Sequence, residues 1–321
     1  MNRNQILMVL MLAVAGAGLA HAQSYPVRPV KLVVASSPGG GSDILGRLLA
    51  QRLTELLGQQ VIVENRAGAS GIIGVDVVAK SPPDGYTLIL TQTSLAINPS
   101  MIKEMPYDAL RDLAPISELI AAPNVLVVHP SVPVKTVKEF IALAKSKPGR
   151  LVIASPGQGT SPHLSGELFK VMAKVDLEQV PFKGAGLGMI SLLGGEVSVA
   201  FPTTTTIMPY MKNGRLRPLG VTSAKRAQVL PDVPTIAEAA LPGYESTQWY
   251  GILAPAGTPR PIIDILYKAI SRVLRTADFR ERLAGDGAEV VDGAPEAFAA
   301  YLKSETEKWA RVIKAAGIKP E

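Results

Sequence analysis

The sequence predicts an α/β protein of two domains. Apolar runs typical of buried strands alternate with helical patterns along almost the whole chain. The 321 residues suffice for two domains of ordinary size, and 47% of them are hydrophobic. Two glycine-rich turns, at 38–43 and 155–163, each follow a predicted strand and precede a predicted helix. Because sites in such folds form at the carboxyl ends of strands, we expect the two turns to face each other across a cleft.

Residues 1–22 have the composition of a secretory signal peptide. Arg3 supplies the positive end, residues 6–20 form the apolar stretch, and Ala20-His21-Ala22 fits a cleavage site. The apolar run is shorter than the roughly 20 residues that a spanning helix needs, so a membrane anchor is the weaker interpretation. Without cysteine there is no disulfide and no lipidated thiol. We therefore expect a free periplasmic protein, cleaved after Ala22.

Composition argues against several function classes. The formal charge of +6 is spread along the chain, aromatic residues are few, and no nucleic-acid motif is present, so we expect no nucleic-acid partner. His129 and His163 are the only histidines after residue 22, which is too few for a zinc site without cysteine. No G-x-S-x-G motif of a serine hydrolase occurs. We expect no enzyme, no metal and no cofactor.

The elements follow in chain order from apolar patterns and turn signals. Gly58 and Pro148-Gly149 end two helices, and prolines at 99, 106 and 115 predict an irregular segment over 92–120. The expected strands are 30–34, 61–63, 86–91, 125–128, 151–154, 180–183, 197–201, 216–221 and 249–254. The expected helices are 43–57, one ending near 80, 137–145, one starting at 162, 185–193, 261–274, 279–283 and 295–315.

The first glycine turn is suited to an anion. Gly39, Gly40 and Gly41 let the chain turn sharply and leave backbone N–H groups uncovered, while Ser42 or Asp43 can cap the following helix. A helix N-terminus with free N–H groups favours a carboxylate or a phosphate. The turn lacks the Lys and Ser/Thr of a P-loop and the glycine spacing of a dinucleotide fold.

The second turn repeats this arrangement. Ser155 ends a strand, Gly159 and Thr160 follow, and Pro162 behind a capping Ser161 predicts a helix start. One such turn alone is weak evidence, because many βα turns are glycine-rich for packing reasons. Two of them at one cleft predict an anion clamp, in which each dipole contributes ~0.3–1 kcal/mol and each N–H bond to a carboxylate ~1.5–3 kcal/mol.

The chain resembles the Bug family of periplasmic solute-binding receptors, the extracytoplasmic subunits of tripartite tricarboxylate transporters. The resemblance extends in order over nearly all of the chain after residue 22. The matching stretches are YPVRP at 25–29, PGGGSD at 38–43, ENRAGASG at 64–71, PDGYT at 83–87, GTSPHL at 159–164, VPFKG at 180–184 and LPDVPT at 230–235.

This resemblance implies a two-domain periplasmic binding protein of the type II, Venus-flytrap class, with the ligand cleft between the domains. The expected domains are 24–122 plus 248–321 and 123–247, with the hinge near Val125 and Trp249. The expected ligand is a small carboxylate, which a monomeric receptor delivers to membrane permease subunits. The residues implied to face the ligand are Gly39, Gly40, Gly41, Ser42, Asp43, Ser94, Ser155, Gly159, Thr160, Ser161, His163, Lys183, Gly184, Ala185, Pro202 and Thr203.

One departure from the family pattern bears on the ligand. After the strand that ends at Phe201, many relatives have an acidic or amide residue, whereas this chain has Pro202 and then Thr203 to Thr206. The missing charge argues against an amino-acid ligand, whose ammonium group needs a partner. A di- or tricarboxylate or an aromatic acid fits better. The threonine run either supplies hydroxyl donors or is only a loop.

Several residues keep two interpretations. His163 either donates to a carboxylate or packs locally, and Lys183 either pairs with the ligand or is solvated. Asp43 either contacts the ligand or, as we prefer, bonds to backbone N–H groups as a helix cap. Trp249 and Tyr250 either stack on a ligand or pack at the hinge. The receptor itself serves transport or, as the alternative, a signalling partner.

Overall fold

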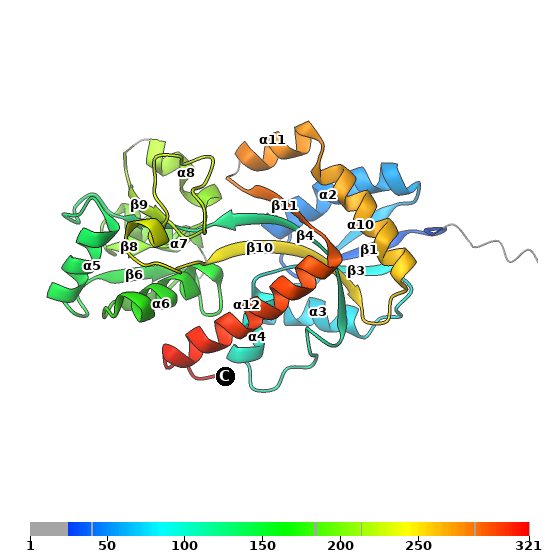
Figure 1. Ribbon diagram of the computed structural model, residues 1–321, viewed down its shortest axis with the longest axis horizontal. Coiled ribbons are helices and arrows are strands. Elements are labelled where there is room, and N and C mark those ends of the chain that lie inside the picture. The colour runs from blue at the N-terminus through cyan, green and yellow to red at the C-terminus, as the bar shows by residue number, and fades with distance from the viewer. Residues whose placement is uncertain (1–24, 40, 183–184, 213, 286, 321) are drawn as a thin grey trace, which may run out of the picture.

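The computed structural model describes residues 25–39, 41–182, 185–212, 214–285 and 287–320, and it consists of two lobes (Figure 1). The predicted signal peptide lies outside the described residues. One lobe is built on a six-stranded sheet of order β11-β4-β10-β3-β1-β2, the other on a five-stranded sheet of order β7-β6-β8-β5-β9. The predicted α/β class with two sheets is confirmed. Among the described helices, none is long and apolar enough to cross a membrane.

The elements have the following bounds. The strands are β1 (Val30–Val34), β2 (Val61–Asn65), β3 (Thr87–Gln92), β4 (Leu113–Pro123), β5 (Val125–Val128), β6 (Val152–Ser155), β7 (Glu178–Pro181), β8 (Val199–Ala200), β9 (Arg217–Val221), β10 (Thr247–Pro255) and β11 (Glu289–Gly293). The helices are α2 (Gly41–Leu57), η1 (Ala69–Gly71), α3 (Ile72–Ala79), α4 (Ser94–Met101), α5 (Val137–Ser146), α6 (Ser161–Ala173), α7 (Ala185–Leu193), α8 (Thr204–Lys212), α9 (Ile236–Ala239), α10 (Arg260–Leu274), α11 (Ala277–Gly285) and α12 (Pro295–Ala315).

In the first lobe, helices cover both faces of the sheet. Strands β1, β2 and β3 are parallel, and β10 runs antiparallel beside β3. Leu32 and Leu90 pack with α2 and α10, whereas Val33 and Ile89 pack on the other face with α3, α4 and α12. This two-sided burial explains why β1 is apolar at successive positions rather than alternating. The carboxyl ends of β1, β2 and β3 then lie at one edge of the sheet.

The second lobe has a mixed sheet. Strand β6 is parallel to β7 and β8, while β5 is antiparallel to β8 and β9. Phe169 lies at the centre of its core, with ring centroids 5.7 Å from Phe140, 5.8 Å from Phe201 and 6.3 Å from Tyr244. Such tilted aromatic contacts add to the free energy gained from burial. This rigid core supports β6 and the N-terminus of α6.

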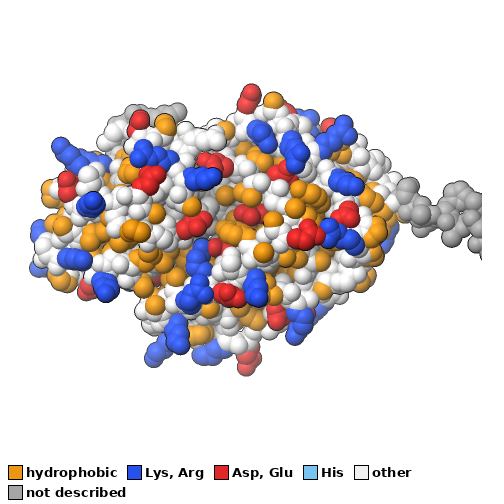
Figure 2. Space-filling view, viewed as in Figure 1, with side chains coloured by type: hydrophobic (Ala, Val, Ile, Leu, Met, Phe, Trp, Pro, Cys, Tyr) orange, Lys and Arg blue, Asp and Glu red, His pale blue; other side chains and the backbone are white. Residues whose placement is uncertain are grey.

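Two long strands join the lobes. Strands β4 and β10 pair antiparallel along their length and continue into the second lobe, as Figure 1 shows. Helix α12 packs against β4 and α4 of the first lobe and against α6 of the second. Charged side chains of both signs lie on both lobes and at the waist between them in Figure 2. The expected domain boundaries near residues 122 and 247 stay a prediction.

The prediction of an irregular segment over 92–120 is confirmed for 102–112, between α4 and β4, and was wrong on either side of it. Helix α4 contains Pro99, and β4 contains Pro115 at a shift in register with β10, where the missing N–H is tolerated. Four further elements were not predicted. These are the short 3₁₀ helix η1, the helix α8, which starts inside the threonine run, the short helix α9 and the edge strand β11, in which Asp292 has a φ of 52°.

Candidate functional site

The first loop connects β1 to α2, and the Asp43 carboxylate holds it in shape. This carboxylate accepts the backbone N–H of Gly39 at 2.8 Å and the Asn65 amide at 2.9 Å, and it pairs with Arg47 at 3.0 Å. The Asn65 amide also donates to the Ser36 carbonyl at 3.1 Å. The hydrogen bond from Arg47, followed by that from Gly39, lowers the Asp43 pKa to about 2. The side chain is therefore buried, charged and fully engaged.

This geometry decides the interpretation of Asp43. The predicted bond to a backbone N–H group is present, but it comes from Gly39 in the turn. However, α2 begins at Gly41, so Asp43 lies in the first helical turn and reaches back to Gly39 rather than acting as the N-cap. The Gly39 N–H group is consequently occupied within the loop. Gly40 lies outside the described residues, which leaves Gly41 and Ser42 as the described first-loop candidates for a ligand.

A polar group under the first loop was missed by sequence reasoning. The Ser42 hydroxyl donates to Gln92 Oε1 at 3.2 Å, and Gln248 Nε2 donates to the same oxygen at 3.0 Å. The Tyr250 hydroxyl lies so close to Gly41 that a Cβ there would sit 3.2 Å from it. Burial raises the Tyr250 pKa, so the phenol is neutral. No spacing in the sequence connects these three segments, because the sheet alone brings them together.

Trp249, in contrast, belongs to the packing between β10 and α12. Its side chain is fully buried, and its ring centroid lies 5.5 Å from that of Phe298 and 6.2 Å from that of Tyr301. Of the two interpretations, this favours hinge packing for Trp249. Tyr250 has the opposite orientation along the strand and borders the hollow beside Gly41.

The second loop connects β6 to α6, and Thr160 caps the helix. The Thr160 hydroxyl accepts the His163 N–H at 3.4 Å and donates to the Gly157 carbonyl at 2.8 Å. The prediction that Ser161 is the cap was wrong by one residue, because α6 begins at Ser161. Gly157 and Gly159 have φ angles of 136° and 70°, which favour glycine. Ser155 is buried, with its hydroxyl 3.4 Å from Gly157 N.

A buried hydrogen-bond group ties the second loop to both strand crossings. Asn124, between β4 and β5, donates through Nδ2 to Ser161 Oγ at 2.7 Å and to Ser165 Oγ at 2.8 Å. Ser165 Oγ lies 2.7 Å from Ser246 Oγ, just before β10. All four residues are at most 3% exposed. Asn124 was not among the predicted site residues, since a single asparagine between two strands carries no recognisable pattern.

The remaining predicted site residues lie at or near helix starts or outside the described residues. His163 is 9% exposed, burial lowers its pKa, and no partner of its Nδ1 is found among the described residues, so both of its interpretations stay predictions. Ser94 is half-buried and begins α4 at the end of β3. Ala185 begins α7. Lys183 and Gly184 lie outside the described residues.

Each of the two loops borders a cavity. A cavity of about 280 Å³ is lined by Gly41, Tyr250 and Thr203, and a smaller one of about 110 Å³ by Thr203, Pro202 and the second-loop residues Pro156 and Pro162. Thr203 lines both. The first loop thus borders a space between the lobes, and the second loop borders an adjacent space within the second lobe. Both spaces meet at Thr203, beside the position where this chain departs from the family pattern.

Comparison with known proteins identifies the family. Residues 45–318 match the model described as "Tripartite tricarboxylate transporter family receptor" (TctC). The chain belongs to this receptor family. Protein BugT of Bordetella pertussis is 36% identical over 324 residues, which cover 99% of each chain.

Solved structures of family members superpose over most of the receptor. R. palustris Rpa4515 with adipate has a TM-score of 0.80 at 37% identity, and the match covers 92% of this chain and 100% of that one. The periplasmic binding protein BugD has a TM-score of 0.78 at 34% identity, with the same coverage. MatC from Rhodopseudomonas palustris with bound malate has a TM-score of 0.75 at 33% identity, covering 90% and 100%. The predicted family and the fold of a periplasmic binding protein are confirmed, and this family comprises binding proteins rather than enzymes.

Proposed function

We propose that this receptor captures a small carboxylate between the first loop and the second loop and delivers it to the membrane subunits of a tripartite tricarboxylate transporter. The observation that carries the proposal is that the first loop borders a cavity between the lobes, the second loop borders an adjacent cavity of the second lobe, and Thr203 lines both. Each loop also ends at the N-terminus of a long helix, α2 or α6. Two helix N-termini converging on one space favour an anion over a neutral ligand.

Both loops are held in place before a ligand arrives. Asp43 and Asn65 fix the first loop, and the charge of Asp43 is balanced by Arg47 rather than left beside an incoming anion. In the second loop, Asn124 donates to Ser161 Oγ, which leaves the Ser161 hydroxyl proton free to donate to a ligand oxygen. Preorganised donors lose less conformational entropy on binding, so more of their hydrogen-bond energy contributes to affinity.

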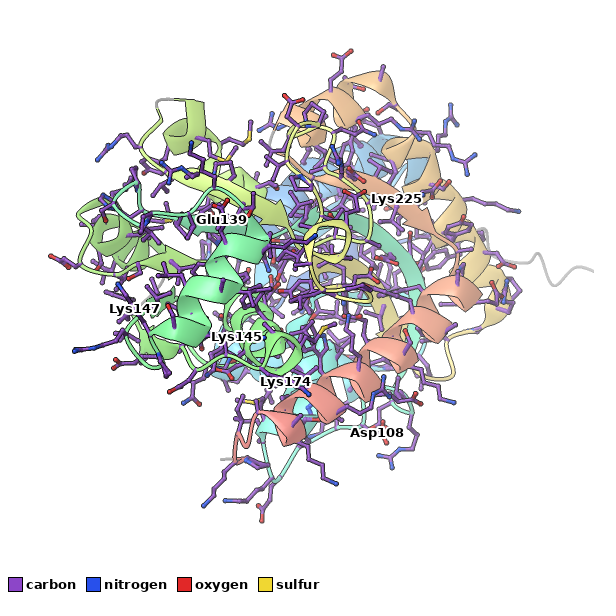
Figure 3. All side chains as sticks on the ribbon, turned by 60° about the vertical axis from the view of Figure 1, so that its left-hand side comes forward. Asp108, Glu139, Lys145, Lys147, Lys174 and Lys225 are labelled. Carbon is purple, nitrogen blue, oxygen red and sulfur yellow. The ribbon has the colours of Figure 1, made fainter. Side chains whose placement is uncertain are left out.

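The ligand class follows from charge. Relatives with 33–37% identity bind adipate and malate, which are dicarboxylates. Pro202 and Thr203 carry no charge to match an ammonium group, so we infer a di- or tricarboxylate or an aromatic acid rather than an amino acid. Residues 123–247 contain 13 Lys and Arg against 8 Asp and Glu, an excess of five positive charges that attracts such anions at long range. Figure 3 shows Lys145, Lys147 and Lys174 of this segment on its outer surface.

A thermal-shift screen of the protein without its signal peptide tests the proposal. The compounds are mono-, di- and tricarboxylates, aromatic acids, acidic amino acids and, as a neutral control, sugars. A ligand at 100 times its Kd stabilises the folded state by ~2.7 kcal/mol, which raises Tm by several degrees. If sugars or cations raise Tm and no carboxylate does, the proposal is wrong.

A substitution in the first loop locates the site. Gly41→Asp places a carboxylate at the N-terminus of α2, where it repels an anionic ligand, and we expect at least a tenfold loss of affinity. The control is Gln51→Glu, which adds the same charge at an exposed position of α2, ~15 Å along the helix. Equal affinities for the two variants would remove the first loop from the site.

A further inference from the structure

The cavity of about 280 Å³ beside the first loop has a mostly aliphatic wall. The wall includes Ile44 and Leu48 of α2, Ile120 of β4 and Leu283 of α11. We call it the α2–α11 cavity. Apolar cavities of ~150 Å³ in proteins hold a benzene ring, so this one has room for a larger hydrocarbon group. The polar side chains that line it are those of Thr203, Tyr250 and Arg282.

Part of the lining belongs to the proposed carboxylate site. Gly41 and the Tyr250 hydroxyl lie there, next to the first loop, and Thr203 of the second lobe closes the space from the other side. A ligand whose carboxylate sits at the first loop therefore has this cavity directly beside it. Ile44, one turn into α2, is 50% exposed although it faces the cavity. An exposed isoleucine beside a polar loop is a surface that a ligand's hydrocarbon can cover favourably.

Arg282 of α11 is the charged residue among the described lining residues. A guanidinium group at an otherwise aliphatic wall is well suited to a carboxylate, which it can bind through two parallel hydrogen bonds. A neutral or hydroxyl-rich ligand would use neither the wall nor this charge. The arrangement therefore fits a ligand with an apolar middle and a second acidic group.

A contact between the lobes lies next to the cavity, between the neighbours of the lining residues Thr203 and Ala288. Thr204, which begins α8 in the second lobe, donates its hydroxyl to the Gly287 carbonyl at 2.7 Å, just after α11. The approach is so close that a Cβ on Gly287 would lie 2.7 Å from the Thr204 side chain. Because the cavity has walls from both lobes, a ligand that fills it binds the closed arrangement better than an open one.

We propose that the α2–α11 cavity receives the apolar chain or ring of the ligand and that Arg282 binds its second carboxylate. The preferred ligand is then a dicarboxylate whose acidic groups are separated by hydrocarbon, rather than a short hydroxylated or tricarboxylic acid. This inference rests on the proposed function, because it takes the first carboxylate to lie at the first loop.

Calorimetric titration with a homologous series tests the wall. The probes are the unbranched dicarboxylates from succinate to suberate, with citrate and malate for comparison. Affinity should rise about fourfold per added methylene until the cavity is filled. Leu48→Gln, which makes the wall polar at nearly constant volume, should flatten this dependence. If all dicarboxylates bind with equal affinity, the cavity assignment is wrong while the proposed function stands; if no carboxylate binds, the proposed function itself fails.

A comparison of mono- and dicarboxylates of equal length tests Arg282. Arg282→Gln should weaken adipate binding by tenfold or more and leave hexanoate binding within twofold of the unmodified protein. Arg272→Gln is the control, since Arg272 is an exposed arginine of the neighbouring α10 that does not line the cavity. If adipate and hexanoate lose equal affinity, Arg282 acts only through long-range electrostatic attraction and does not bind the second carboxylate. If adipate loses no affinity, Arg282 is excluded from the site.

Discussion

Replacing Asn124 by alanine should affect both the folded state and the ligand site. The substitution removes two hydrogen bonds of 2.7 and 2.8 Å to Ser161 and Ser165, each with a net contribution of ~0.5–1.5 kcal/mol. Asn124 Oδ1 is buried without a partner among the described residues, so removing this atom offsets part of the destabilisation. We expect a net destabilisation of about 1–2 kcal/mol, measured by urea denaturation of the ligand-free protein.

The effect on affinity separates a site role from a hinge role. Without the Asn124 amide the Ser161 hydroxyl is no longer oriented, and losing one hydrogen bond to a carboxylate, at ~1.5–3 kcal/mol, weakens binding about ten- to a hundredfold. The control is Ser246→Ala, which removes a partner of Ser165 in the same buried group but leaves the bond to Ser161 intact. Both variants should lose stability, and only Asn124→Ala should lose affinity in calorimetric titration. If neither variant changes Kd, Asn124 serves the hinge alone and the reasoning on Ser161 is refuted.

Three further substitutions test the remaining energetics. Asp43→Asn should destabilise the protein by about 2 kcal/mol at pH 7, because the pKa of Asp43 in the folded state, about 2, lies below the ordinary 3.8. The difference in stability between the two proteins, measured by thermal denaturation, should shrink as pH falls through 3. Burial first, and then Glu305 and Glu245, raise the Glu118 pKa to about 7. A carboxyl group whose pKa is higher in the folded state lowers the protein's stability as pH rises above the pKa of the unfolded state. The stability of Glu118→Gln, measured by urea denaturation, should therefore increase by about 2–3 kcal/mol relative to that of the unmodified protein between pH 4.5 and 8. A difference that stays constant with pH would contradict this. Gly251→Ala places a Cβ 2.3 Å from the Phe298 ring and should cost 1–3 kcal/mol, which Phe298→Leu in the same chain should partly restore.

Elements with a strong local pattern were predictable from the sequence. The apolar run of β1, the periodic α10 and the helix α7 closed by two glycines lie where they were expected. The errors came where tertiary pairing overrides a local signal. Pro115 reads as a strand breaker, yet β10 accommodates it at a shift in register, and β11 is a strand only because β4 offers it an edge.

The site was predictable only in its loops. Glycine content and helix starts located both turns, but the residues that hold them come from distant segments. Asn65 contacts the first loop from β2, Gln248 reaches Gln92 from β10, and Asn124 contacts α6 across the crossing. A single polar residue at a strand end has no periodicity, and only the sheet topology brings it to its partner.

The two loops are fixed to different parts of the molecule, and this difference assigns them different parts in closure. The first loop is tied by Asp43 and Asn65 to its own sheet, so it moves with its lobe as one body. The N-terminus of α6 is tied through Asn124 to one crossing and through Ser246 to the other. In the proposed closure, rotation of the lobes would bend these crossings and act on the second loop directly. We therefore infer that the free energy of anion binding at the second loop depends on the closure angle, whereas the first loop offers the same donors in open and closed forms.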